Sequence, residues 1–336
     1  MTQVRGAPAP GWAVRDSSMT RFHVRLALAA ALIAAVVSLC EGRDAAPVQA
    51  PAPTTAGTKA IASSAALSTP WPHRIIAVGD LHGDLAHTRE SLRLVDVIDA
   101  SDHWAAGNAT FVQIGDVMDG GDDVRAILDL LRNLEREAAA AGGRAIELIG
   151  NHETYSLVGD QASVSARDMA SFGGEEARRA AFSQTGEYGA WLRTHKAVVI
   201  VDDIVFVHGG LTPEMAKLGV DALNAGVLGY LNGGPPSPFL DRRNGPLYFL
   251  GYLEAPTTDA CSRLDEALQT LGARRMVVGH TPSDDGLMVA PCGGHLIGID
   301  TGISDPYGIH SSVLEIMNGD AWAVYPGGRI DLPDPR

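Results

Sequence analysis

The chain has 336 residues, of which 46% are hydrophobic and 20% are charged, so it is long enough for one large globular domain or two small ones. Its formal net charge at pH 7 is -14, and no run of basic residues interrupts that balance. We therefore expect no nucleic-acid partner, because such a surface does not neutralise the phosphates of a nucleic-acid backbone.

The first 43 residues have the pattern of an export segment. Basic residues between Met19 and Arg25 precede an uncharged apolar run from Leu26 to Leu39. The run is shorter than the about 20 residues that cross a bilayer, and it fits the core of a signal peptide. The alternative is a buried N-terminal helix, which the preceding arginines and the following proline-rich stretch disfavour.

Cys40 follows the apolar run, where a lipid-modified cysteine would stand in a bacterial lipoprotein. Leu39 occupies the position where such proteins need a small residue, which favours simple cleavage over lipidation. Residues 44–70 are rich in Ala, Pro, Thr and Ser and are predicted to be a disordered linker. We expect a periplasmic or secreted protein that meets the membrane only through its export signal or a lipid anchor at Cys40.

From residue 71 onward, short apolar runs alternate with segments of helical periodicity, a pattern typical of an α/β sandwich. The predicted strands are 74–78, 110–114, 145–149, 197–201, 204–207, 275–278, 296–299, 312–316 and 321–325, and the predicted helices are 85–97, 122–141 and 258–271. We expect residues 154–196 to form a mostly helical cap and residues 211–258 an irregular binding loop. The last three strands are predicted to be antiparallel and to close a second sheet.

Two cysteines, Cys261 and Cys292, lie within this folded part. In an exported protein an even pair of cysteines is a candidate disulfide. The alternative is two unlinked thiols in the core, since sequence alone does not show that they approach each other.

Five predicted strands end at residues of the types that bind metal ions in proteins. These residues are Asp80 and His82, Asp116, Asn151, His208 and His280. One aspartate after a strand is usually a turn residue and one histidine is usually structural, but five coincidences of the same kind are hard to assign to turns. Since parallel strands deliver their carboxyl ends to one edge of a sheet, we expect these side chains to meet. The remaining histidines, His73, His87, His103, His195, His295 and His310, fall outside the pattern and are predicted to be surface or structural residues.

The types of these residues indicate the chemistry. Oxygen and imidazole donors without thiolate suit Mn, Fe or Zn at a hydrolytic site. Two ions about 3.5–4 Å apart can share a carboxylate and a hydroxide and hold the oxygens of an in-line displacement. Two carboxylates with four neutral donors leave net positive charge, as a phosphate dianion requires. The pattern predicts a two-metal centre that cleaves phosphate esters.

The motifs that carry these residues resemble the five blocks of the calcineurin-like metallophosphatases, and more narrowly the phosphoprotein phosphatase (PPP) family. The matching blocks are 79–83, 115–119, 150–153, 208–210 and 279–280, and residues 121–123, 207–213, 277–281 and 299–304 resemble the bacterial Shewanella-like branch. The resemblance covers about residues 74–316 and implies one metallophosphoesterase domain over residues 71–328. The fold it implies is a four-layer sandwich of two mixed β-sheets flanked by helices, with a helical and loop cap.

The resemblance also implies how the residues act. Asp80 and His82 would bind the first metal ion, Asn151, His208 and His280 the second, and Asp116 would bridge them. A hydroxide that bridges the ions would attack the phosphorus, so no protein nucleophile is needed. His152, held by Asp119, would be the general acid that protonates the leaving oxygen. The implied substrates are phosphoproteins of the phosphotyrosine type.

Two positions depart from the family pattern. Gly120 stands where the family has an arginine that holds the phosphate, and Leu250 stands where the resembled branch has a second arginine. A hydrogen bond to a charged group contributes about 1.5–3 kcal/mol, so losing both arginines should weaken substrate binding unless another group substitutes. Arg242 and Arg243 are candidates for that role, and the alternative is that they are solvated surface charges.

The same departures keep two other functions open. One is a metallophosphoesterase for a nucleotide or another phosphodiester, and the other is a metal-binding pseudophosphatase that holds a ligand without turnover. Tyr307 follows the last matching block and is predicted either to border the substrate pocket or to pack in the core.

Overall fold

The structure is a computed structural model that describes residues 74–235, 238–241 and 243–335. The predicted export segment, the linker, Cys40 and Arg242 lie outside the described residues. In the described ranges no helix combines the length and the apolar character that crossing a membrane requires.

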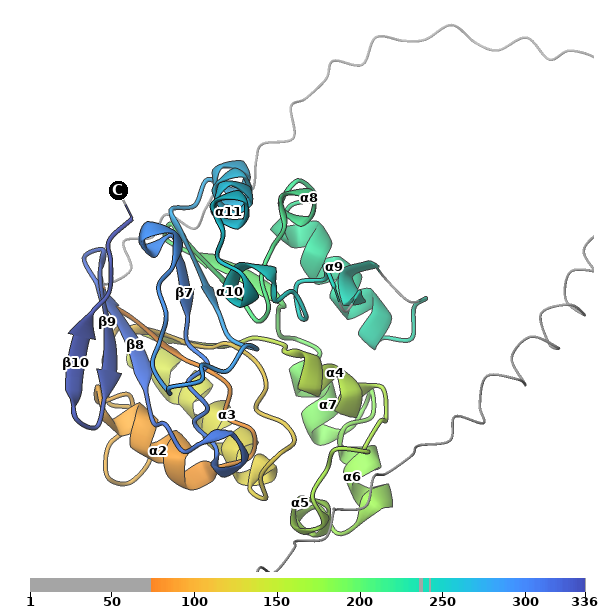
Figure 1. The fold of residues 1–336 in the computed structure, drawn as a ribbon. Helices are drawn as coiled ribbons and strands as arrows, with labels where there is room; N and C mark the ends of the chain where they lie inside the picture. Colours follow the sequence, from red (N-terminus) through yellow and green to blue (C-terminus); the bar gives the residue numbers. More distant parts are fainter. Residues whose placement is uncertain (1–73, 236–237, 242, 336) are drawn as a thin grey trace, which may run out of the picture. The chain divides into compact units, whose positions relative to one another are not determined.

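The larger of two β-sheets has the strand order β10-β9-β8-β1-β2-β3, and the smaller has the order β4-β5-β6-β7. Figure 1 shows β10, β9 and β8 side by side at one edge of the larger sheet. The strands are β1 (Arg74–Val78), β2 (Thr110–Gln113), β3 (Arg144–Glu147), β4 (Val198–Val201), β5 (Ile204–Val207), β6 (Arg275–Val278), β7 (Leu296–Gly298), β8 (Val313–Met317), β9 (Asp320–Tyr325) and β10 (Gly328–Asp331). β1, β2 and β3 are parallel, as are β5, β6 and β7. Antiparallel pairing of β8 with β1 and of β4 with β5 makes both sheets mixed, as predicted.

Helices cover the outer faces of the sheets and form the cap. They are α2 (Leu85–Arg93), α3 (Val124–Ala140), α4 (Asn151–Leu157), α5 (Ala166–Ser171), α6 (Glu175–Ala181), α7 (Glu187–Leu192), α8 (Pro213–Ala216), α9 (Val220–Leu231), α10 (Gly251–Glu254) and α11 (Thr258–Leu271), with 3-10 turns η3 (Pro238–Leu240), η4 (Cys292–Gly294) and η5 (Asp305–Tyr307). Figure 1 shows α4 to α7 grouped together, apart from the strands. The helical cap predicted for residues 154–196 is therefore present.

The apolar residues of β1 show how the layers pack. Successive side chains of a strand point to opposite faces. Ile75 and Ala77 belong to the core between the two sheets, whereas Ile76 and Val78 belong to the core beneath the helices. Strand β5 divides its side chains between the same two cores. The layers therefore follow the predicted order: helices, the first sheet, the second sheet, and helices again.

The prediction that the last strands close a second sheet is wrong for β8 and β9. β8 pairs with β1 in the larger sheet, and β9 and β10 extend that sheet further. Only β7 joins the smaller sheet, where it runs parallel to β6. Alternating apolar residues predict a strand but do not say which sheet edge the strand joins, and β1 offered an edge that only tertiary structure reveals.

The prediction of an irregular loop over residues 211–258 is also wrong in part, because α9 is a helix of 12 residues there. The helix buries Leu223, Val227 and Leu231, which recur every four residues. Gly226 faces η3 so closely that an added Cβ would lie 1.9 Å from the ring of Phe239. Glycine at this position serves helix packing, although in the sequence it reads as a loop residue.

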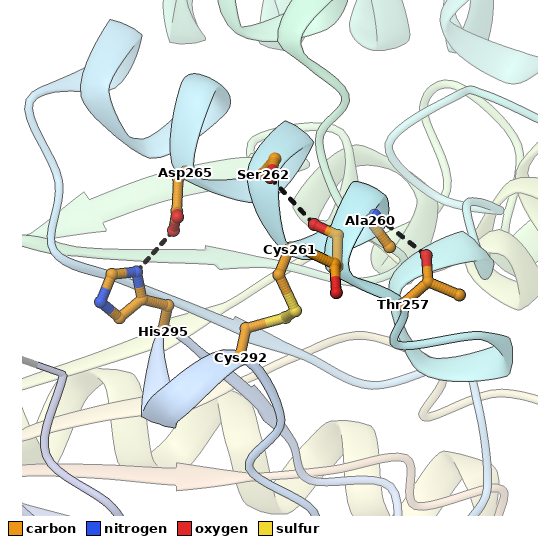
Figure 2. Close-up of a disulfide and its surroundings, with 8 residues drawn as sticks. Thr257, Ala260, Cys261, Ser262, Asp265, Cys292 and His295 are labelled. Atoms are coloured by element: carbon orange, nitrogen blue, oxygen red, sulfur yellow. Dashed lines mark hydrogen bonds and ion pairs between the residues drawn. A yellow bond between two sulfur atoms is a disulfide. The ribbon is translucent and has the colours of Figure 1, made fainter.

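A disulfide joins Cys261 in α11 to Cys292 in η4 (Figure 2). Helix α11 begins at the N-cap Thr257, whose side chain accepts a hydrogen bond from the backbone N–H of Ala260. Nδ1 of His295 lies 2.6 Å from Asp265 and gives a second link between the same two segments. The covalent and polar links together fix α11 to the turn that leads into β7.

Replacing both cysteines by serine should lower the free energy of unfolding by about 2–4 kcal/mol. The cross-link spans a sequence separation of 31 and so restricts the unfolded chain. Urea unfolding of the parent and the Cys261→Ser/Cys292→Ser variant, each with and without dithiothreitol, measures the difference. The reductant should destabilise only the parent, and a parent that is equally stable after reduction would contradict the prediction.

Candidate active site

The six predicted metal ligands follow the carboxyl ends of five parallel strands. Asp80 and His82 come after β1, Asp116 after β2 and Asn151 after β3, all in the larger sheet, while His208 and His280 come after β5 and β6 of the smaller sheet. All are buried except His280, which is half-buried. The two sheets therefore each contribute residues to a single cluster.

Asp116 lies at the centre of this cluster. Its Oδ2 atom is 3.2 Å from Nε2 of His208 and 3.9 Å from Nε2 of both His82 and His152. Potential ligand atoms form two groups, one with His82 and His152 and one with His208 and His280, and Asp116 belongs to both. A carboxylate between two groups of donors is the position of a bridging ligand.

The remaining ligands close around the same point. Nε2 of His208 lies 2.9 Å from Oδ1 of Asn151, and its ring centroid lies 4.9 Å from that of His280. The backbone N–H of His280 donates to the Asp80 carboxylate at 3.2 and 3.3 Å. The structure thus brings all six predicted ligands together.

Two histidine rings are oriented by backbone carbonyls. Nδ1 of His82 lies 3.0 Å from the carbonyl oxygen of Met118, and Nδ1 of His208 lies 3.1 Å from that of Ile114. These contacts assign the proton to Nδ1, so Nε2 points into the cluster with its lone pair, the usual arrangement of a metal-binding histidine. The donor set of imidazole nitrogens and carboxylate and amide oxygens therefore fits divalent metal ions.

The protonation equilibria of the cluster reflect its burial and the charges packed within it. Burial and the nearby charges of Asp300 and Asp116 raise the pKa of Asp80 well above its usual range. Burial resists ionisation of Asp116 as well, but the charge and hydrogen bond of His208 outweigh it and lower the pKa of Asp116. Burial and the charge of His208 lower the pKa of His280 to about 4, so it is neutral at pH 7, the form that binds metal.

His152 and Asp119 form a pair at the rim of the cluster. Nδ1 of His152 lies 2.8 Å from Oδ2 of Asp119, and the backbone N–H of His152 donates to Oδ1 of Asp116 at 2.9 Å. Burial disfavours the imidazolium, but the bond to Asp119 and the charge of Asp116 prevail and raise the pKa of His152 to about 9. Its side chain is 21% exposed, so a protonated imidazole can reach a bound molecule.

Four of these residues have a left-handed backbone. The φ angles are 39° at His82, 56° at Asp116, 63° at Asp119 and 65° at His280. Residues other than glycine adopt this region at a cost of about 1–3 kcal/mol, and such positions are concentrated at functional sites.

Glu153 holds the ligand loops, a role that the sequence did not reveal. Its Oε2 atom accepts hydrogen bonds from the backbone N–H groups of Asp116 and Gly150, and Oε1 accepts from those of Val117 and Met118. Glu153 is the third residue of α4, so its hydrogen bond from the backbone N–H of Gly150 is local and could be predicted from the sequence. The three bonds to the loop after β2 depend on tertiary structure.

Glu153→Gln should weaken metal binding by about 10–100-fold, the usual cost of losing a residue that supports a metal ligand. The glutamine amide keeps one acceptor oxygen but turns an N–H donor toward backbone N–H groups. Equilibrium dialysis against Mn²⁺ measures the change, with Glu176→Gln, an exposed glutamate of the cap, as the control. Equal metal affinity in the Glu153 variant and the control would show that the loop needs no such support.

Asp300 is a second residue whose role the sequence did not assign. It is 5% exposed, follows β7, and its Oδ1 accepts a hydrogen bond from the backbone N–H of Gly302. Burial raises the pKa of Asp300 to about 6, and its charge in turn acts on Asp80. The block 299–304 gave a signal for this residue, because it matched the family pattern without an assigned role.

Two tyrosines lie beside the predicted ligands. The ring of Tyr307 stacks on that of His82, with centroids 4.5 Å apart and planes 18° apart, and Tyr307 is 42% exposed. Tyr248 meets His280 edge to face at 6.0 Å. The structure thus places Tyr307 at the border of the site and not in the core.

The structure gives Arg243 no contact with the cluster. Arg243 is exposed, and the hydrogen bond found for it among the described residues runs from its backbone N–H to Asp241. Its role in substrate binding stays a prediction, as does that of Arg242.

At the first of the two arginine positions the backbone suits the glycine that replaces it. Gly120 has φ +81°, and an added Cβ would lie 3.1 Å from Cβ of His82. Leu250 is the N-cap of α10, at the end of a loop whose Pro246 carbonyl accepts hydrogen bonds from the N–H groups of Gly209 and Gly210. A side chain at residue 120 would thus strain the backbone and crowd a predicted ligand.

Comparison with known proteins extends these observations. Residues 73–284 match the family described as calcineurin-like phosphoesterase. The chain is 33% identical over 279 residues to an uncharacterized protein of Schizosaccharomyces pombe. This alignment covers 78% of this chain and 84% of the yeast protein. It is 32% identical over 282 residues to Shewanella-like protein phosphatase 2 of Arabidopsis thaliana. This second alignment covers 69% of this chain and 72% of the plant protein.

A solved structure is similar as well. The crystal structure of a cold-active protein-tyrosine phosphatase from a psychrophilic Shewanella species aligns with a TM-score of 0.68 and 27% sequence identity. The alignment covers 78% of this chain and 80% of that one. The fold predicted from the sequence is therefore confirmed.

Proposed function

Because this chain belongs to the calcineurin-like phosphoesterase family, with Shewanella-like protein phosphatases among its relatives, and is a metal-dependent phosphoester hydrolase, we propose that it dephosphorylates phosphoproteins of the phosphotyrosine type. The observation that carries the proposal is the contact between His152 and Asp119 at 2.8 Å, at the rim of the six converging ligands. A proton donor beside a metal site is the arrangement that phosphomonoester cleavage requires.

The proposed centre holds two divalent ions, of Mn, Fe or Zn. Asp80 and His82 would hold one ion, Asn151, His208 and His280 the other, and Asp116 both. Bound there, the ions would supply Lewis acidity toward phosphoryl oxygens and make water a stronger nucleophile at neutral pH. The burial of the ligands excludes bulk water from all but the rim.

His152 is the proposed proton donor. With a pKa raised to about 9 it carries a proton at neutral pH, and Asp119 fixes Nδ1 so that Nε2 faces the cluster. An alkoxide or phenolate leaving group gains from a proton delivered at the moment of bond cleavage. Asp119 keeps the imidazolium charged and oriented before transfer.

The preference for an aryl phosphate rests on Tyr307. An exposed aromatic ring stacked on His82 offers a flat apolar surface beside the site, against which a phenyl ring can pack. A protein-tyrosine phosphatase is among the structures similar to this chain. Gly120 and Leu250 in place of arginines favour a second candidate, a less charged phosphodiester or nucleotide.

Turnover on four substrates distinguishes these functions. The purified chain, loaded with Mn²⁺, should hydrolyse p-nitrophenyl phosphate and a phosphotyrosine peptide faster than a phosphoserine peptide or bis-p-nitrophenyl phosphate. Faster cleavage of the phosphodiester would instead support the second candidate. A chain that binds two metal ions per molecule and turns over none of the four would be a pseudophosphatase.

We also infer that the protein is exported to the periplasm or beyond. The disulfide between Cys261 and Cys292 supports this location, because disulfides persist in oxidising compartments. The apolar run from Leu26 to Leu39 supports it independently. N-terminal sequencing of the mature protein tests the inference, and a mature chain that retains this run would refute a cleaved signal. Mass spectrometry of the new N-terminus reveals whether Cys40 carries lipid.

A further inference from the structure

A second group of potential metal ligands lies outside the active site. It consists of Glu135 on α3, Glu147 at the end of β3 and His195 in the turn between α7 and β4. One ligand atom from each side chain lies within 4.8 Å of the other two. None of these residues belongs to the cluster around Asp116.

Glu147 is the feature that calls for a ligand. It is 4% exposed, and in the described part of the chain no N–H or hydroxyl group of another residue donates a hydrogen bond to its carboxylate, whose polar neighbour is the carboxylate of Glu135. An unpartnered buried carboxylate is costly, because burial removes the water that would otherwise solvate the charge. Burial, together with the adjacent carboxylate of Glu135, raises the pKa of Glu147 well above its usual range.

His195 has the same deficit. Its side chain is 5% exposed, and neither ring nitrogen makes a hydrogen bond to any described residue, although Nε2 lies 3.4 Å from Oε1 of Glu135. The other oxygen of Glu135 accepts a hydrogen bond of 2.8 Å from the indole N–H of Trp191. This bond fixes the Glu135 carboxylate and leaves Oε1 facing the histidine.

We propose that Glu135, Glu147 and His195 bind a single zinc ion that fastens the end of the cap to α3 and β3. Two carboxylates and a neutral imidazole cancel the charge of a divalent cation and give three of the four ligands that zinc prefers. Zinc bonds of about 2.0–2.2 Å place donor atoms closer together than 4.8 Å, so binding draws the side chains inward. Glu135 also lines a surface hollow with Arg132 and Trp191, which gives the ion a route from solvent.

The location gives the ion a structural role. The segment that leaves the cap runs beside β3, where the backbone N–H of Ile149 donates to the carbonyl of Lys196. This contact lies one residue after His195 and two residues before Asn151. An ion at Glu147 and His195 therefore steadies the strand end that leads into the active-site loop.

Counting bound zinc tests the proposal. The full chain is stripped with a chelator, incubated with excess Zn²⁺, desalted and analysed by inductively coupled plasma mass spectrometry. Glu147→Gln and His195→Gln should each hold one zinc equivalent fewer than the parent and show a smaller zinc-induced rise in Tm. Glu137→Gln is the matched control, because Glu137 also lies on α3 and contacts a histidine, His103, but its side chain is 35% exposed and it lies outside the group of three.

Equal zinc content in the parent and both variants would overturn the proposal and indicate instead that Glu147 is protonated and shares its proton with Glu135. Crystals of the zinc-loaded parent give a measurement that does not depend on folding of the variants. An anomalous difference peak at the zinc edge should lie between the three side chains. A peak at the Asp116 cluster without one here would also overturn the proposal.

Discussion

Asp116→Asn should reduce kcat on p-nitrophenyl phosphate by at least about a thousandfold, which corresponds to about 4 kcal/mol of transition-state stabilisation. Asp116 is the one residue that both groups of active-site donors share, with histidine nitrogens at 3.2 and 3.9 Å from its Oδ2. Asparagine preserves the shape of the side chain and tolerates a positive φ, so the fold should persist. What it removes is the negative charge that two cations would share.

The matched control for this variant is Asp96→Asn. Asp96 has the same φ of 56° but is exposed and lies outside the cluster, so it controls for the same substitution in the same backbone conformation. Metal content and kcat should both fall in the Asp116 variant and stay at the parent's values in the control. An Asp116 variant as active as the parent would show that the metal assignment is wrong.

His152→Gln should lower kcat for a phosphotyrosine peptide by about 10²–10⁴-fold, the usual contribution of a general acid. The loss should be much smaller for 2,4-dinitrophenyl phosphate, because its leaving group is a stable anion that needs no proton. Metal content should not change, since the predicted ligands include Asn151 but not His152. Steady-state kinetics on both substrates, with metal analysis of each preparation, measures the effect.

His103→Gln serves as the control for this second variant. Its Nδ1 lies 2.9 Å from a carboxylate oxygen of Glu137, much as that of His152 lies 2.8 Å from Asp119, but the pair is on the surface. Equal losses on the two substrates in the His152 variant would exclude proton donation and point to a role in binding. Asp119→Asn should follow the pattern of the His152 variant with a smaller loss.

The ligand positions could be predicted from the sequence because the signal is local. Each ligand stands within a few residues of a short apolar strand, and parallel strands present their ends at one edge. The prediction that Asp119 holds His152 rested on the family resemblance. The structure places the two side chains in contact. Helix α11 was predicted with its observed bounds from the acidic Asp259 near its start and Gly272 at its end, and the structure adds Thr257 as the N-cap.

Other features could not be predicted, because their signal is tertiary. Glu153 has its role through bonds to a loop that lies 35 to 37 residues earlier in the chain. His195 was assigned to the surface or to a structural role, because neither Glu135 nor Glu147 stands near it in the sequence. Only the packing of α3 against β3 and the return of the cap bring these three side chains together.

The distribution of the active-site ligands over both sheets has a consequence for how the protein acquires its metal. Asp80 and the backbone N–H of His280 meet across 200 residues of sequence, so an unfolded or partly synthesised chain offers no preformed site. Binding of the ion that Asn151, His208 and His280 would hold must follow the docking of the smaller sheet on the larger one, because both histidines belong to the smaller sheet. That ion is thus drawn from the metals available once the two sheets have docked, and not from those that the unfolded chain meets earlier.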